Sequence, residues 1–118
     1  MTALEDAETH YAKGATAPRI TLDYIKSQIG SAHYMRGFRM VQGAAHSDWS
    51  AKDNSIPDSV QNLTVCLLVL KSGWTVIGHS TPLSGGNFDE TKGREIAYEN
   101  AVRQLWPLFG FAAKQNAS

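Results

Sequence analysis

The residues with the clearest chemical potential surround the start of the last predicted helix. Gly85, Gly86 and Asn87 precede this helix, and Arg94 and Arg103 lie within it. Glycines ahead of a helix leave N–H groups free at its positive end, where anions bind, and arginines add bidentate hydrogen bonds to phosphate. Aromatic side chains for stacking on a base are Trp74, Tyr98 and Trp106. These are the parts of a small nucleotide-phosphate pocket, although a capped helix with surface arginines and core aromatics requires the same residues.

The other reactive side chains favour structural roles. The four histidines are His10, His33, His46 and His79. None of them has metal-ligand spacing to another histidine or to Cys66, and Cys66 lies in an apolar run that is typical of a buried core thiol. The sequence contains no nucleophile elbow, Walker loop or dinucleotide fingerprint. We therefore expect no catalytic residue, no metal and no cofactor, and we predict that the chain is not an enzyme.

The composition is typical of a small soluble protein. The chain has 118 residues, of which 42% are hydrophobic and 19% charged, and this length corresponds to one domain. Its 11 basic residues balance 11 acidic ones, whereas DNA-coating and membrane-binding proteins need a strong positive field. The acidic start, residues 1–6, does not resemble a secretion signal, and the longest apolar run, residues 65–70, is too short to cross a bilayer. We expect a cytosolic protein with neither DNA nor membrane as partner.

The N-terminal half gives one clear signal. Residues 1–17 are polar with a thin apolar face, and we predict a loosely held, flexible arm. A helix is expected to begin after Thr21, which suits an N-cap, and to end at Gly30. A strand is predicted over residues 34–40, followed by a long loop over residues 42–62.

The C-terminal half gives stronger signals. Residues 63–71 and 74–80 predict two strands joined by a two-residue turn, which is a β-hairpin. The first of these strands is apolar on both faces, which predicts a cover of helices on one side and of another strand layer or another subunit on the other. The last helix is predicted over residues 88–106, with Asn87 as its N-cap and Pro107 as its stop.

Small residues recur every fourth position in this last helix, at Gly93, Ala97 and Ala101. This stripe predicts close packing on a sheet or on another helix, and Ile96, Val102 and Leu105 are expected to widen the buried face. The elements together predict a single α+β domain over residues 18–118. Its expected architecture is an antiparallel β-hairpin or small antiparallel sheet, packed by an N-terminal helix and a long C-terminal helix.

The sequence resembles a family of small tailed-bacteriophage accessory proteins of unknown function. The resemblance covers residues 18–111 and lies in residues 18–22, 67–78, 87–89, 93–94 and 99–108. The last of these blocks, which ends in Trp-Pro-Leu, is the most specific. The resemblance implies a phage protein that acts in the host cytoplasm.

The order of a hairpin followed by a basic helix also resembles the sponge proteins with which phages counter Thoeris immunity. Those proteins sequester cyclic ADP-ribose signals in homo-oligomeric assemblies, and they hold the ligand with an aromatic stack, an asparagine and arginines. Residues of those types in this chain are Arg19, Trp74, Asn87, Arg94 and Arg103. The resemblance, which rests on residue type and order, implies a non-enzymatic anti-defence protein that binds a nucleotide-type ligand at these residues.

Other functions stay open at this point. The low charge, the two-sided apolar strand and the loop over residues 42–62 also suit a stoichiometric inhibitor that docks on a host protein. A hydrolase or transferase has little support in the sequence. In each binding role we expect a homo-oligomer, a dimer or a multiple of it, because the two-sided strand needs a cover and two-fold symmetry is the commonest arrangement.

Overall fold

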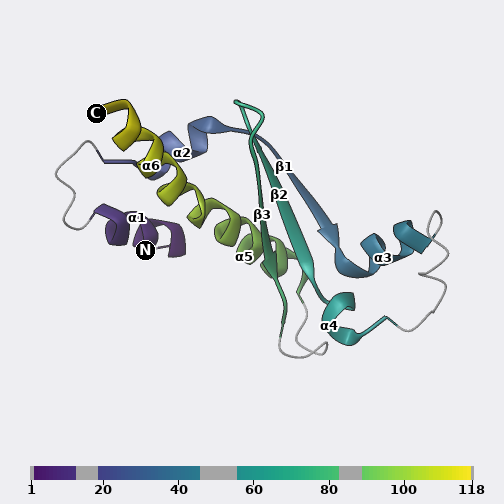
Figure 1. Cartoon of the computed structure of the whole chain (residues 1–118). Coiled ribbons are helices and arrows are strands. Elements are labelled where there is room, and N and C mark those ends of the chain that lie inside the picture. The colour runs from purple at the N-terminus through teal and green to yellow at the C-terminus, as the bar shows by residue number, and fades with distance from the viewer. Residues whose placement is uncertain (1, 13–18, 46–55, 83–88, 118) are drawn as a thin grey trace.

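The computed structural model describes residues 2–12, 19–45, 56–82 and 89–117 (Figure 1). The elements in chain order are α1 (Ala3–Ala12), α2 (Leu22–Gln28), β1 (Ile29–Arg36), α3 (Gly37–Ala45), α4 (Asp58–Gln61), β2 (Thr64–Leu70), β3 (Thr75–Ser80), α5 (Glu90–Arg103) and α6 (Leu105–Ala117). The strands form an antiparallel sheet in the order β1-β2-β3. This arrangement confirms the predicted α+β fold, with a small antiparallel sheet packed by helices from both ends of the chain.

The β2–β3 hairpin is formed as the sequence predicts. Val69 pairs with Thr75 across the turn, and Gly73 adopts a φ of 94°, a left-handed conformation that favours glycine. Along β2, every second side chain from Thr64 to Leu70 is buried and the alternate ones are half-buried. The two faces of the sheet are therefore covered to different extents.

Helix α5 covers one face of the sheet and packs against β2 and β3 (Figure 1). The contact is made by backbone on backbone: a Cβ atom placed on Gly78 of β3 would lie 2.8 Å from the Ala101 Cα and closer still to the Ala97 carbonyl oxygen. Gly93, Ala97 and Ala101 are all buried, so the predicted small-residue stripe is confirmed as the surface that packs closely. Ile96 differs from the expectation, because it is on the exposed side of the helix.

The N-terminal segment packs against the rest of the molecule through α1. Leu4 and Ala7, one turn apart, are buried in the core, and the Tyr11 ring stacks on Trp106 with ring centroids 5.7 Å apart. Glu8 accepts a hydrogen bond from the backbone N–H of Leu22. These contacts differ from the loosely held arm predicted for residues 1–17, because two small apolar side chains on one helix face suffice to dock a short helix.

The region between α2 and β2 differs most from the sequence-based prediction. Thr21 is the N-cap of α2, as expected, and accepts a hydrogen bond from the Tyr24 N–H at 3.1 Å. The helix nevertheless ends at Gln28, and Gly30 already lies in β1, so the predicted stop at Gly30 is wrong. The strand predicted over residues 34–40 lies earlier in the chain, because pairing with β2 fixes its position. Helices α3 and α4 occupy parts of the segment predicted as a long loop, of which residues 46–55 lie outside the described residues.

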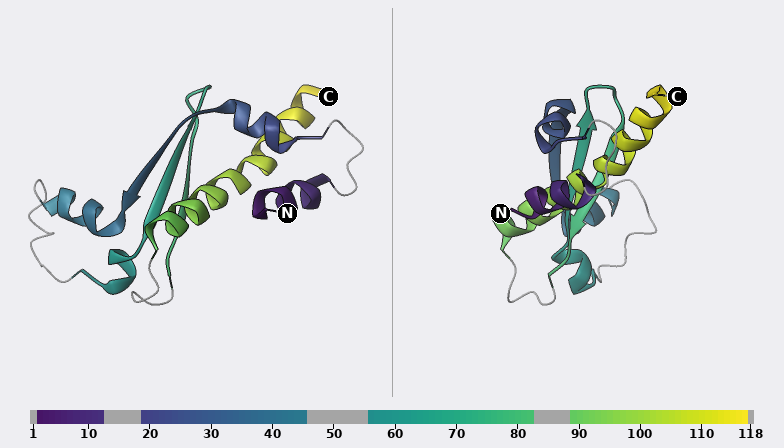
Figure 2. Two further views of the ribbon diagram at one scale, coloured as in Figure 1. Left: turned by 180° about the vertical axis from the view of Figure 1, so that it is seen from behind. Right: turned by 90° about the vertical axis from the view of Figure 1, so that its left-hand side faces the viewer.

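The C-terminal helical segment is bent at Gln104 and not stopped at Pro107. Helix α5 begins at Glu90, two residues later than predicted, with Asp89 as the N-cap that accepts from the Lys92 N–H. Pro107 is the third residue of α6, a position in the first turn where its missing N–H has no intrahelical partner to lose. The helix then continues to Ala117. Figure 2 shows the result: α1, α2 and α6 gather at one end of the sheet, and α3 and α4 at the other.

The backbone contact between Gly78 and α5 predicts opposite effects for two glycine-to-alanine changes. Gly78→Ala should lower the free energy of unfolding by about 1–3 kcal/mol, because the added methyl group meets backbone atoms that have no room to move. Alanine is otherwise favoured over glycine in a strand. A loss of stability in Gly78→Ala is therefore attributed to the close contact with α5. Denaturant unfolding of both variants provides the measurement.

Gly110→Ala is the matched control, because a Cβ atom at Gly110 in α6 meets nothing within 4 Å. This change should leave stability unchanged or raise it by about 0.5–1 kcal/mol, the gain from replacing a helical glycine. A Gly78→Ala variant as stable as the parent would contradict the observed packing of α5.

Candidate functional site

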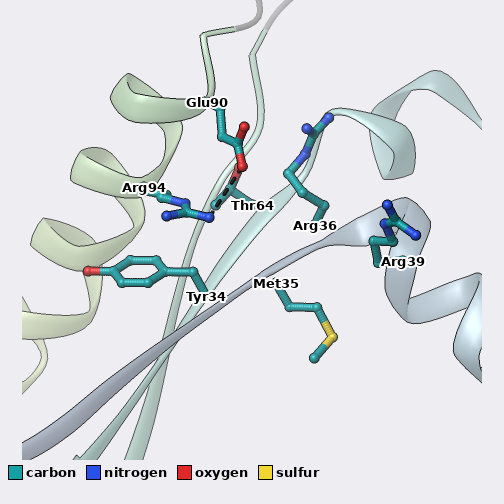
Figure 3. A pocket seen from close by; sticks show the side chains of 7 residues that line it. All are labelled: Tyr34, Met35, Arg36, Arg39, Thr64, Glu90 and Arg94. Atoms are coloured by element: carbon teal, nitrogen blue, oxygen red, sulfur yellow. Dashed lines mark hydrogen bonds and ion pairs between the residues drawn. The ribbon is translucent and has the colours of Figure 1, made fainter.

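A pocket of about 240 Å³ lies where β1 ends, β2 begins and α5 begins (Figure 3). The residues that line it are Tyr34, Met35, Arg36, Arg39, Thr64, Glu90 and Arg94. We call it the arginine pocket, because three guanidinium groups surround it and a single carboxylate accompanies them. Its net positive charge favours an anionic ligand.

Strand register and a tight turn bring the first two arginines to the pocket. Arg36 is paired with Thr64 across the β1–β2 ladder, and its guanidinium donates a hydrogen bond to the Gln61 carbonyl oxygen at 2.9 Å. Helix α3 begins at Gly37 directly after the strand, where a Cβ atom would collide with the Val60 carbonyl oxygen. Glycine at this position therefore permits α4 to pack closely against the start of α3, whose first turn carries Arg39.

The third arginine comes from α5 and is already held by two neighbours. The Arg94 guanidinium lies 3.3 Å from the Glu90 carboxylate, one helical turn earlier, and 5.5 Å from the centroid of the Tyr34 ring. Both members of the ion pair are about half exposed, and such pairs contribute at most about 1 kcal/mol. A pair this weak leaves the Arg94 guanidinium available to a ligand that offers it more acceptor oxygens.

Thr64 supplies a polar group that lacks a partner within the described part of the chain. Its residue is 1% exposed, it lines the pocket, and its Oγ1 atom makes no hydrogen bond to any described residue. A buried hydroxyl without a partner costs about 1–3 kcal/mol of desolvation, and such groups are rare in folded proteins. A ligand with acceptor oxygens in the pocket would satisfy this hydroxyl.

Beneath the pocket, Tyr34, Cys66 and Tyr98 form a cluster of protonated groups. Burial raises the pKa of the Cys66 thiol, although a hydrogen bond with Tyr34 opposes the increase. Burial also raises the pKa of Tyr34, and the neighbouring Cys66 raises it further. The pKa of Tyr98 is raised by burial and by Cys66. All three groups therefore keep their protons at neutral pH, and Cys66 is not poised as a nucleophile.

The structure places only one of the sequence-predicted ligand residues, Arg94, at this pocket. Arg103 lies nine residues further along α5, which is two and a half turns, so it is on the opposite side of the helix and about 13 Å along its axis. Trp74 follows the far end of β2, roughly 20 Å from Thr64, and Arg19 forms a 3.8 Å ion pair with Glu8. Asn87 lies outside the described residues, as do Gly85 and Gly86.

Sequence reasoning missed Arg36, Arg39 and Thr64. The signal for Arg36 was its spacing from Tyr34, because residues two apart in a strand share one face. In the sequence, Arg36 and Arg39 interrupt the apolar residues of the segment 34–40, so neither indicated a binding site. Thr64 gave no local signal, since its partner in the pocket is 28 residues earlier in the chain.

Among the described residues, no group of three or more histidine, cysteine or acidic side chains is arranged to hold a metal ion. None of the helices in the described ranges has the length and apolar character that crossing a membrane requires.

Comparison with known proteins identifies the family. Residues 20–117 match the family described as "Phage protein (N4 Gp49/phage Sf6 gene 66) family". Because the match covers most of the chain, the protein belongs to this family, and the resemblance to a small phage protein family is confirmed. No curated protein and no solved structure matches the chain.

The protonated cluster beneath the pocket predicts a loss of stability at alkaline pH. Cys66, Tyr34 and Tyr98 have pKa values above their ordinary ones of 9.0 and 10.0, so the folded state binds their protons more tightly than the unfolded state. The stabilisation is fully present below about pH 8 and is lost as the pH rises through the folded-state pKa values. Urea unfolding at several pH values between about 8 and 10.5 should therefore show a falling free energy of unfolding.

Cys66→Ala provides the control for this pH dependence. The variant should unfold more easily at neutral pH, because the smaller side chain leaves a cavity, but its stability should decline less steeply as the pH rises. An equal slope in both proteins would show that Cys66 is not part of the alkaline response.

Proposed function

From membership of this phage family and the geometry of the arginine pocket, we propose that the protein is a phage accessory protein with an anti-defence role. It binds a phosphate-bearing, nucleotide-type molecule such as cyclic ADP-ribose in the arginine pocket. It acts in the host cytoplasm and sequesters the molecule there without converting it chemically.

The observation that carries this proposal is the combination of three guanidinium groups with a buried hydroxyl that no described residue satisfies. The Arg36 and Arg39 guanidinium groups each lie close to the Phe38 ring, at 5.1 and 5.2 Å from its centroid. Arginine also matches phosphate geometry better than lysine does, because its planar fork donates two parallel hydrogen bonds.

The size of the pocket determines which part of the ligand it holds. Sites for whole drug-sized molecules measure about 300–1,000 Å³, whereas this pocket measures about 240 Å³. The pocket therefore encloses the phosphate end of a nucleotide, with the base outside it.

Binding without catalysis is the proposed mode because the reactive groups beside the pocket are held in their unreactive forms. The raised pKa values of Tyr34 and Cys66 keep both protonated at neutral pH. Glu90 is engaged with Arg94. A protein that only holds its ligand acts stoichiometrically, which suits sequestration.

A second candidate function is a stoichiometric inhibitor that binds a host protein. The observation that favours it is the exposure of large apolar side chains on the sheet face opposite α5, where Met35 is 51% and Ile77 59% exposed. Met35 and Ile77 lie on the two outer strands, with the half-buried apolar side chains of β2 between them, and a continuous exposed apolar patch is typical of a protein-binding surface. This function predicts that no nucleotide binds and that a host protein is retained through this face.

Calorimetric titration tests the ligand proposal. Cyclic ADP-ribose, ADP-ribose and inorganic pyrophosphate are the probes, and at least one should bind more tightly than about 100 μM. Arg36→Ala and Arg94→Ala should each weaken binding roughly tenfold or more, since a hydrogen bond to a charged group contributes about 1.5–3 kcal/mol. Arg103→Ala, on the opposite side of the same helix, should leave binding unchanged.

Two further variants distinguish binding from structural roles. Thr64→Val removes a buried hydroxyl with no described partner, so it should weaken binding while leaving the melting temperature unchanged or raised. Glu90→Gln frees Arg94 and removes the negative charge, so it should tighten binding roughly two- to fivefold. Binding lost in Arg103→Ala but retained in Arg94→Ala would overturn the assignment of the site, and no binding of any probe would overturn the function.

A further inference from the structure

The sheet face opposite α5 is formed by the odd-numbered residues in 31–35, 65–69 and 75–79. Cross-strand pairing fixes this set, because β2 pairs directly with both of its neighbours: Leu67, for example, lies between His33 and Ile77. The side chains on β1 and β3 are exposed and those on β2 are half-buried. We call this surface the open sheet face.

The open sheet face carries no aspartate, glutamate, lysine or arginine, although 19% of the chain is charged. Its apolar side chains fill the central strand β2 with Val65, Leu67 and Val69 and extend to Met35 on β1 and Ile77 on β3, and serine, threonine and histidine occupy the other positions on the two outer strands. The core of a protein interface is apolar and depleted of charged residues, and its rim is polar. The open sheet face has this composition.

We propose that the open sheet face binds the same face of a second copy of this chain, so that the protein is a two-fold symmetric dimer. The two sheets pack face to face about 10 Å apart, and α5 of each copy lies on the outside. Leu67, at the centre of the face, lies near the two-fold axis.

The absence of charge on this face favours a second copy over a different protein. A two-fold interface brings identical groups against one another, and charged side chains there would repel their own copies. Surfaces that recognise a different protein commonly use complementary charges for steering and specificity, and the open sheet face offers none.

Met35 lines the arginine pocket and also belongs to the open sheet face. The pocket is otherwise separate from this interface, because Tyr34, Arg36 and Thr64 are even-numbered positions whose side chains are on the α5 side of the sheet. The dimer and the ligand site therefore rest on largely different residues, and an experiment can contradict one without contradicting the other.

Sedimentation equilibrium over a range of concentrations tests the dimer. The parent should have twice the chain mass of 12.9 kDa at tens of micromolar, and its melting temperature should rise with concentration. Ile77→Lys should convert the dimer to a monomer that keeps the parent's circular dichroism spectrum, because Ile77 is 59% exposed within one chain and lysine there does not disturb the fold.

Ile96→Lys is the matched control, because Ile96 is 40% exposed but lies on α5, away from the proposed interface. It should remain dimeric. A parent that is monomeric at these concentrations would overturn the proposal, as would a dimer that persists in Ile77→Lys. A monomeric parent that instead retains a host protein through Ile77 would assign the face to the inhibitor function.

Discussion

The position of α5 depends on one backbone contact, in which Gly78 of β3 lies directly beneath Ala97 and Ala101. Because no side chain separates the strand from the helix, the helix cannot slide or rotate without a collision or a void. Arg94 and Glu90 lie in the first turns of the same helix, so their distance from Tyr34 on β1 is set by this contact. The pocket is rigid on this side because its helix is fixed by close backbone packing.

The C-terminal half of the fold was predictable because its signals are local. The apolar run of β2, the Ser72–Gly73 turn and the repeat of small residues in α5 are each contained within one element, and each predicted its structure correctly. The boundary between α5 and α6 was not predicted, since proline stops a helix in its interior but is accepted in the first turn of a new one. The sequence around Pro107 does not show which of the two applies.

The N-terminal half was less predictable because long-range pairing decides its structure. Residues 29–33 lack a strong strand pattern, yet they form β1 because β2 offers them a ladder of hydrogen bonds. The arginine pocket also depends on long-range strand pairing. Arg94 was found from the sequence because its helix is a local feature, whereas Arg36 and Thr64 become neighbours only through strand register. The predicted convergence of Arg94 with Arg103 failed for a simpler reason, because residues nine apart on a helix point in opposite directions.

The strict alternation of side chains along β2 gives the sheet two different surfaces. Even-numbered residues carry the α5 contact and, at the end of the strand, the Thr64 hydroxyl in the pocket, whereas odd-numbered residues form the uncharged open sheet face. A slip of one residue in the β1–β2 register would exchange the two sets, placing Arg36 on the uncharged face and Met35 against α5. Two constraints therefore act on the β1–β2 register. On one face of the sheet, α5 must pack closely, and on the other face the proposed dimer requires that no charged side chain is present. The described part of the chain has three strands with which to build both surfaces, so each strand contributes to both.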